Sequence, residues 1–175
     1  MLLVREVRAL AGNLPDEDFC RQVGPFALVR RPPNPAVERI AMQLGVHRTR
    51  ISRHSAHSKI LMAELLQHFD DLNVATLPPI QGSEELQIGR LPDNDLVIDD
   101  PSVSKRHAVL RWDHISRRCM VTDLGSRNGT TVNAEYVRDP NCLVVDGDML
   151  SFGDAEFCFL ETQSLLAMLR AAGNY

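Results

Sequence analysis

The stretch LGSRNGTTVN, residues 124–133, indicates how this chain folds. Its Asn128-Gly129 pair lies between β-prone residues, and Asn-Gly is the strongest short-range signal for a β-hairpin because both residues tolerate positive φ. The turn also carries Ser126 and Arg127, whose side chains donate hydrogen bonds. Two interpretations are open at this point: a surface hairpin, or a loop shaped to hold an anion.

Short β-prone runs flank this turn on both sides. They are ELQIGR, DLVID, HAVLRW, CMVTDL, TTVN, CLVV, MLSFG and EFCFL, and segments rich in Gly, Pro, Asp and Asn divide them. About eight short strands separated by turn signals are typical of an all-β sandwich or barrel. The second half of the chain is therefore expected to be antiparallel β-structure.

The first part of the chain shows a helical periodicity instead. One apolar stripe with the i, i+3, i+4, i+7 spacing runs from Val37 to Leu44, and a second runs from Ile60 to Leu72. A short helix is also expected over residues 2–10. The segment ATLPPIQGSEE, residues 75–85, ends this pattern because its prolines and glycine interrupt helices and strands alike.

These patterns predict a mainly β chain in three parts. A helical N-terminal region covers residues 1–76, a β-sandwich covers 77–163, and a short C-terminal helix and tail cover 164–175. Thr76 would then lie in a linker, where its phosphorylation could fill a binding site on this chain or on a second copy.

Charge is distributed unevenly along the chain. The net charge is −4, which gives no global reason to expect binding to nucleic acid or acidic membranes. Between Arg30 and Lys59, however, seven basic residues stand against the single acidic Glu38. This local excess is the one feature that favours an acidic partner or DNA.

The location expected for the chain is cytoplasmic, without membrane contact. Arg5 and Arg8 interrupt the apolar N-terminus before a signal sequence could form, and no apolar stretch approaches the ~18 residues of a membrane span. The four cysteines are widely separated and fit neither a zinc site nor a dense disulfide framework.

Three separated pieces of the β-half share one chemistry. They are Gly89-Arg90 at the end of a strand, Ser104-Lys105-Arg106-His107 in a loop, and Ser126-Arg127-Asn128-Gly129 in the turn described above. Each offers hydrogen-bond donors, and loops at one end of a sandwich can converge on a ligand. A phosphate group, which presents acceptor oxygens and about −1.5 to −2 charges at pH 7, is the ligand that suits these donors.

Together, QIGR, SKRHA, DLGSRNGTTVN and DGDMLSFGD occur in an order that is far more specific than any one of them. Residues 86–160 resemble a forkhead-associated (FHA) domain, a β-sandwich that reads phosphothreonine. The resemblance implies that Arg90 grips the phosphate, that Ser104 meets it through its hydroxyl and backbone, and that Lys105 adds a polar or charged contact. It also implies that Asn128 holds the peptide backbone beside the phosphothreonine.

The resemblance assigns the remaining residues of the predicted site as well. Asn133 would assist the binding loop, while Gly89 and Gly129 would provide shape and His107 would brace the loop from behind. Arg127 departs from the family pattern, in which a small hydroxyl residue precedes the asparagine. The hydroxyl residue here is Ser126, one position earlier, so both Ser126 and Arg127 are expected at the phosphopeptide, with Arg127 as a charged contact or as a bystander.

The expected function is a non-enzymatic phosphopeptide-binding adaptor without a cofactor. Its partner would be a phosphothreonine-containing protein of a Ser/Thr kinase pathway, either the kinase or its substrate. The N-terminal helices would pass recognition to a partner or support self-association. A module that binds proteins without reading phosphate is a further possibility.

Three other segments of the sequence are candidates for DNA or metal binding. Residues 39–58 resemble a helix-turn-helix with Arg48, Arg50 and Arg53 on its second helix, so an FHA-gated DNA-binding transcriptional regulator is the alternative. His47, His54 and His57 are not expected to bind metal because no carboxylate or cysteine accompanies them. The run PDNDLVIDD lacks the glycine and glutamate of a calcium loop, so we expect no metal there.

Overall fold

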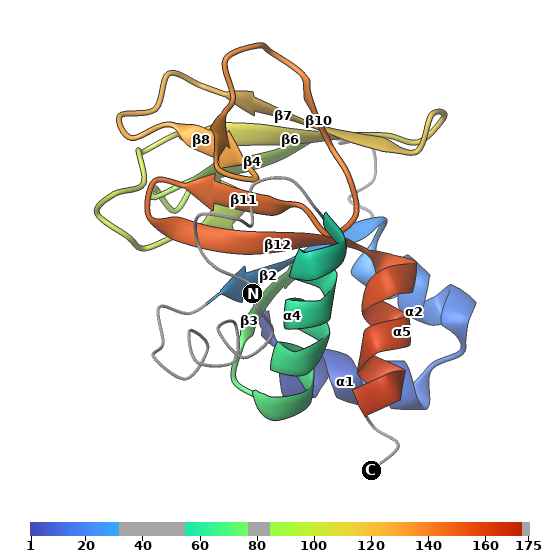
Figure 1. Ribbon diagram of the computed structural model, residues 1–175. Helices are drawn as coiled ribbons and strands as arrows, with labels where there is room; N and C mark the ends of the chain where they lie inside the picture. Colours follow the sequence, from blue (N-terminus) through green and yellow to red (C-terminus); the bar gives the residue numbers. More distant parts are fainter. Residues whose placement is uncertain (32–54, 77–84, 173–175) are drawn as a thin grey trace.

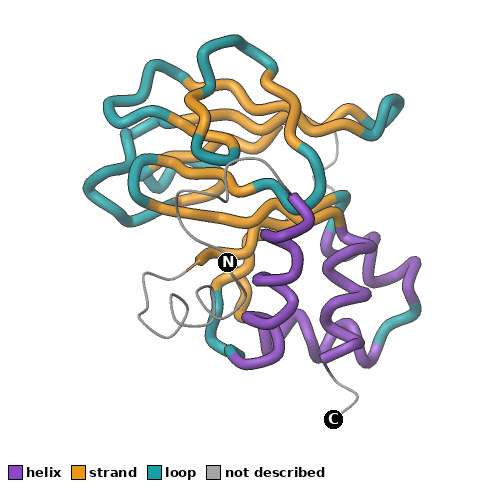
Figure 2. Tube along the Cα trace, in the orientation of Figure 1, coloured by secondary structure: helices purple, strands orange, loops and turns teal. Residues whose placement is uncertain are grey.

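The structure of the protein is a computed structural model, which describes residues 1–31, 55–76 and 85–172. Two β-sheets pack face to face, and a layer of helices covers part of the outer face of one of them (Figure 1). Figure 2 shows the segregation of helix and strand into these layers. The predicted fold class, a β-sandwich with helices toward both ends of the chain, is confirmed.

Sheet B is the smaller sheet and contains five strands. In spatial order they are β10 (Cys142–Val144), β7 (Arg118–Asp123), β6 (Ala108–Asp113), β4 (Glu85–Gly89) and β5 (Leu96–Val97). All neighbours are antiparallel except β4 and β5, which run parallel.

Sheet A contains seven strands, and every pair of neighbours is antiparallel. In spatial order they are β1 (Leu2–Leu3), β3 (Asn73–Thr76), β2 (Phe26–Arg31), β12 (Ala155–Glu161), β11 (Met149–Phe152), β8 (Thr130–Val132) and β9 (Glu135–Tyr136). The eight runs expected to form strands all do so, and β9 is an additional short strand.

An aromatic cluster fills the space between the sheets. The Phe26 ring lies 4.8 Å from that of Phe159 and 5.9 Å from that of Trp112, measured between centroids. Phe152 and Phe157 are fully buried in the same core. Such rings bury large apolar areas, so this cluster provides much of the stability that holds the two sheets together.

The N-terminal region predicted to be helical, residues 1–76, also contains strands, because β1, β2 and β3 belong to sheet A. Strand β2 pairs with β12 along six consecutive residues, from Phe26 with Glu161 to Arg31 with Glu156. Its side chains are buried on both faces: Leu28 points into the sandwich core and Val29 contacts the helices. A strand buried on both faces reads as a continuous apolar run and lacks the period-2 alternation that identifies exposed strands.

Among the described residues, four helices cover the outer face of sheet A over β1, β3, β2 and β12 (Figure 1). They are α1 (Val4–Asn13), α2 (Asp16–Val23), α4 (Ser55–His68) and α5 (Thr162–Ala172). The helix expected at 2–10 begins instead at Val4, where the Glu6 carboxylate accepts the backbone N–H of Leu3 at 2.7 Å. Their buried side chains form a second core, separate from the core between the sheets.

The helical layer is attached to the sandwich by polar contacts as well as by this core. The Asp146 carboxylate, in the turn after β10, pairs with Lys59 of α4 and accepts the hydroxyl of Ser164 of α5. The region expected to be an arm is therefore packed on the sandwich. The expected boundary at 76–77 adjoins residues 77–84, outside the described residues. Thr76 itself is not in a linker, since it ends β3 and pairs with Ala27.

The interpretation of Asn128-Gly129 as the turn of a β-hairpin is also wrong. The loop that contains it connects β7 of sheet B to β8 of sheet A, so it crosses between sheets instead of joining paired strands. Gly129 does have positive φ, 80°, whereas the tight hairpin turn lies at Asn133 and Ala134, with φ of 51° and 66°. Both central residues of that turn are left-handed, as a two-residue hairpin between twisted strands requires.

Candidate functional site

The end of β4 brings Gly89 and Arg90 against the loop that follows β5. A Cβ on Gly89 would lie 2.3 Å from the carbonyl oxygen of Lys105, so only glycine allows this approach. The backbone N–H of Arg90 donates to the Ser104 carbonyl at 3.0 Å, and Nε of Arg90 donates to the Val103 carbonyl at 3.3 Å. Arg90 is exposed, and its two Nη atoms have no partner among the described residues.

Ser104 connects this loop to the β7–β8 loop. Its Oγ accepts the backbone N–H of Arg127 at 2.9 Å, so the hydroxyl proton is directed elsewhere. The contact places Arg90, Ser104 and the backbone of Arg127 around one surface, as the sequence predicts. The side chains of Lys105 and Arg127 are exposed and have no partner among the described residues, so their positive charges are available to a ligand.

His107 is fully buried and holds the two loops together from below. Its Nδ1 accepts the backbone N–H of Ser104 at 3.0 Å, and its Nε2 lies 3.1 Å from the Gly129 carbonyl. Because Nδ1 is an acceptor, the proton belongs on Nε2 and the ring is neutral. Burial lowers the pKa of His107, which agrees with a neutral ring. Its placement is that of a brace, with no exposed nitrogen for a ligand.

Asp123, which sequence reasoning missed, organises the base of the β7–β8 loop. Its carboxylate accepts the backbone N–H groups of Gly125 and Ser126 and the hydroxyls of Ser126 and Thr130, at 2.6–2.9 Å. Burial alone would raise the pKa of Asp123, but these hydrogen bonds lower it below its ordinary value. The sequence signal was an Asp followed by Gly and Ser, which is typical of a side chain that accepts the N–H groups after it.

Asn128 is held in a defined orientation at the rim of the loop. Its Nδ2 donates to the Ser102 carbonyl at 2.7 Å, and its Oδ1 has no partner among the described residues, so that oxygen is available as an acceptor. Ser102 is fixed in turn, because its N–H and hydroxyl both donate to Asp100. The hydroxyl bond from Ser102 is the main reason that the pKa of Asp100 lies below its usual value.

Asn133 is not part of this surface. Its Nδ2 donates to the Asp148 carboxylate at 2.8 Å, and its Oδ1 accepts the backbone N–H of Met149 at 3.0 Å. These bonds tie the β8–β9 turn to the start of β11. Asn133 therefore supports sheet A, while the converging groups are those of Arg90, Ser104, Arg127 and Asn128.

The described residues show no comparable convergence of side chains at the other candidate sites from the sequence. Apart from its last residues, at the start of α4, the helix-turn-helix-like segment 39–58 lies outside the described residues, as do His47 and His54. Among the residues described, no three His, Cys, Asp or Glu side chains are grouped to hold a metal ion. In the same residues, no helix has the length and apolarity needed to cross a membrane.

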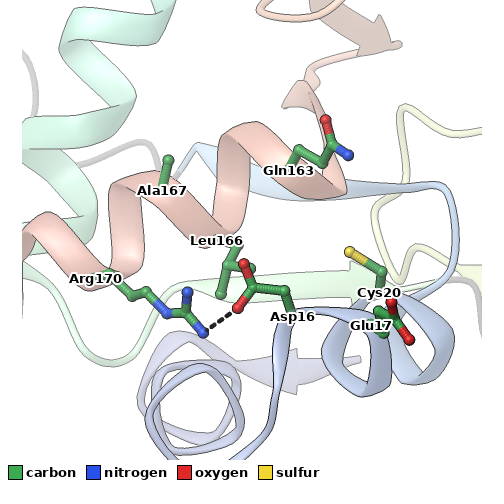
Figure 3. A pocket seen from close by; sticks show the side chains of 7 residues that line it. All are labelled: Asp16, Glu17, Cys20, Gln163, Leu166, Ala167 and Arg170. Carbon is green, nitrogen blue, oxygen red and sulfur yellow. Dashed lines mark ion pairs between the residues drawn. The ribbon is translucent and has the colours of Figure 1, made fainter.

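A cavity of about 470 Å³ lies between α2 and α5, away from these loops (Figure 3). Arg170 and Asp16 form an ion pair of 2.7 Å at one side of it, and Cys20 lies on the α2 side. Its only arginine is already paired with a carboxylate, so the cavity offers no free cation comparable to Arg90. The loops therefore remain the candidate functional site.

The segment that contains these loops is similar to known proteins. The family model described as "FHA domain" matches residues 86–153. A solved FHA domain, studied for phosphothreonine-dependent interactions, is 32% identical, with 83% of it and 50% of this chain covered and a TM-score of 0.44. The chain belongs to the FHA domain family.

Two curated relatives are similar to part of this chain. The glycogen accumulation regulator GarA of Mycobacterium tuberculosis is 40% identical over 72 residues, which are 41% of this chain and 42% of GarA. The transcriptional regulatory protein EmbR of the same organism is 40% identical over 81 residues, 46% of this chain and 20% of EmbR. The chain thus spans less than half the length of these relatives.

One structural neighbour extends beyond the FHA domain. Full-length yeast Pml1p aligns with 78% of this chain and 81% of its own length, at a TM-score of 0.51 and 19% identity. At that identity the likeness concerns the fold alone.

Proposed function

We propose that this chain is a phosphopeptide-binding signalling protein whose FHA domain recognises phosphothreonine in a partner from a Ser/Thr protein kinase pathway. The observation that carries the proposal is the exposed Arg90 guanidinium, whose Nη atoms have no partner in the part of the chain that the structure describes and whose backbone N–H is bonded to Ser104. A planar guanidinium matches the oxygens of a phosphate and binds them in bidentate fashion.

Each of the other groups has a definite role in this proposal. Ser104 donates its hydroxyl proton to the phosphate, because its oxygen already accepts the N–H of Arg127. Lys105 and Arg127 add positive charge beside it. The available Oδ1 of Asn128 accepts a backbone N–H of the bound peptide and holds the peptide extended. His107, Gly89 and Gly129 keep these groups in place.

The energetics favour a moderate affinity. Each charge-assisted hydrogen bond contributes about 1.5–3 kcal/mol net. Three or four such bonds must offset several kcal/mol of association and ordering cost, so a dissociation constant on the order of micromolar is expected. Affinity of this size suits reversible recognition that a kinase and a phosphatase control.

The proposal includes a binding role and no catalytic role. The converging groups are donors that stabilise an anion, and the one buried histidine among them has both nitrogens occupied by backbone groups. We propose a cytoplasmic location, where Ser/Thr kinases would supply the ligand. The N-terminal helices α1, α2 and α4, which pack on sheet A, would serve as a surface for a second partner or a second copy.

Calorimetric titration with a phosphothreonine peptide selected from an oriented phosphopeptide library tests the proposal. Arg90→Ala should weaken binding by at least about tenfold, the loss of one strong charge-assisted bond. Arg111→Ala is the matched control, since Arg111 is also exposed but pairs with Glu85 on the outer face of sheet B. Binding that survives removal of the phosphate and ignores Arg90→Ala would contradict the proposal.

A further inference from the structure

A groove of about 270 Å³ opens on the outer face of sheet A, beside the proposed phosphopeptide site. Asn128 lines it, and so do Gly153 and Asp154 from the β11–β12 turn. Since Ser102 receives the amide of Asn128 on its carbonyl and the N–H of Asp154 on its hydroxyl, one residue fixes both sides of this junction. The groove therefore adjoins Asn128, the residue proposed to contact the peptide backbone.

The floor of the groove is a row of polar residues across five neighbouring strands. Direct strand partners in this row are Arg31 with Glu156, Glu156 with Ser151, Ser151 with Thr131, and Thr131 with Tyr136. Partners directly opposite each other in a sheet point to the same face. The row is thus a continuous polar surface.

The neighbouring row on the same face is apolar and lies under the helices. It contains Val74, Val29, Cys158 and Met149, all buried in the helix-covered core. The change from apolar to polar side chains coincides with the edge of the helical layer. Figure 1 shows β8 and β11 extending beyond the helices, which cover β2 and β3. The described helices pack over the apolar row, and the part of the polar row on β8, β9 and β11 lies beyond them.

The charges in the groove leave one carboxylate available. Arg31 is buried and pairs with Glu156 at 3.3 Å, so these two charges compensate each other. Asp154 is exposed, and its carboxylate has no partner in the part of the chain that the structure describes. The groove therefore carries a net negative charge at the end nearest Asn128.

Tyr136 gives the same groove an aromatic wall. It is 62% exposed, an unusual exposure for so large an apolar ring, and it lies against Gly129. A carboxylate together with an exposed aromatic ring favours a cation, above all the guanidinium of arginine, which stacks on ring faces and pairs with carboxylates. The hydroxyls of Ser151 and Thr131 supply further acceptors.

We propose that this groove is a specificity subsite that takes an arginine of the bound peptide, close in sequence to its phosphothreonine, between Asp154 and Tyr136. The inference rests on the proposed function and deepens it. The positive loops bind the phosphate and the negative groove binds the flanking cation, so the ligand is a phosphothreonine peptide with a nearby basic residue.

The test is a scan in which one phosphothreonine peptide carries arginine, alanine or glutamate at each flanking position in turn. At one position arginine should bind about threefold to tenfold more tightly than alanine, the size of a partly exposed cation–π and carboxylate contact. Asp154→Asn should abolish this gain, and Asp154→Lys should transfer the preference to glutamate. Asp139→Asn, the same change on an exposed carboxylate of another loop, is the control and should retain the arginine gain.

The outcomes of this experiment distinguish an incorrect subsite proposal from an incorrect proposed function. A flat arginine scan, or an arginine gain unchanged in Asp154→Lys, overturns the subsite if binding still needs the phosphate and Arg90. Binding that needs neither overturns the proposed function itself. Because the Asp154 contact to Ser102 uses the backbone N–H, substitution of the side chain leaves that hydrogen bond in place.

Discussion

The hydroxyl of Ser126 donates to Oδ2 of Asp123 at 2.7 Å and therefore points into the base of the β7–β8 loop. The sequence suggested that this hydroxyl meets the phosphopeptide, one position earlier than the family pattern places it. In this structure the hydroxyl that faces the neighbouring loop is that of Ser104. The two serines thus have different consequences when they are replaced.

Ser126→Ala should lower the free energy of unfolding and change phosphopeptide affinity by less than about threefold. The lost bond is to a charged carboxylate, so the destabilisation is about 1.5–3 kcal/mol. Ser104→Ala should give the opposite profile, with a larger loss of affinity than of stability. Urea unfolding and calorimetric titration of both variants measure these effects, and equal profiles for the two would contradict the assignment.

Gly89→Ala should unfold the loop junction or the whole domain. The new Cβ would lie 2.3 Å from the Lys105 carbonyl, which belongs to backbone and cannot swing away. Overpacking of this kind costs about 1–3 kcal/mol or more. Gly12→Ala is the matched control, because space is open around Gly12 in α1 and alanine is favoured in helices by up to ~1 kcal/mol. Thermal melts should move in opposite directions for the two variants.

Stability should fall on mild acidification because of His107. Burial lowers the pKa of His107 below its ordinary 6.5, so the unfolded chain binds a proton at a pH where the folded chain does not. The neutral His107 therefore contributes its full stabilisation above about pH 6.5. That stabilisation is lost as the pH falls toward the lower pKa that His107 has in the folded chain. Urea midpoints measured from pH 7.5 to pH 5 should decrease.

His107→Gln, which has no titrating ring, should flatten that dependence. Its stability at neutral pH should be lower, because one amide group cannot replace both the Ser104 and the Gly129 contacts. If the urea midpoint of His107→Gln fell with pH as steeply as that of the parent chain, His107 would be excluded as the cause of the pH dependence.

Leu28→Ala should destabilise the sandwich although Leu28 lies outside the matched FHA segment. Leu28 is fully buried in the core between the sheets, where leucine-to-alanine changes cost about 2–5 kcal/mol. Leu143→Ala is the control, since Leu143 is half-exposed on β10 and should change the unfolding free energy little. An unchanged midpoint for Leu28→Ala would show that β2 is dispensable.

The order of turns and short strands from residue 85 onward was enough to predict the sandwich, because each of those strands alternates or ends at a clear turn signal. Strand β2 escaped prediction because both of its faces are buried, one by the second sheet and one by helices. Which partner covers a strand is a property of the assembled layers. A local pattern of six residues cannot encode it.

The sequence by itself also determined the chemistry of the candidate site. The FHA resemblance assigned Arg90 and Ser104 to the phosphate and Asn128 to the peptide backbone, and a phosphate group does suit charged and hydroxyl donors. Only the tertiary structure decided which groups point outward. It turned Ser126 inward to Asp123, committed Asn133 to Asp148, and left Asp154 without a partner among the described residues. The physical reason is that a side chain's hydrogen-bonding capacity is fixed by its type, whereas its partners are fixed by segments that fold against it from far along the chain.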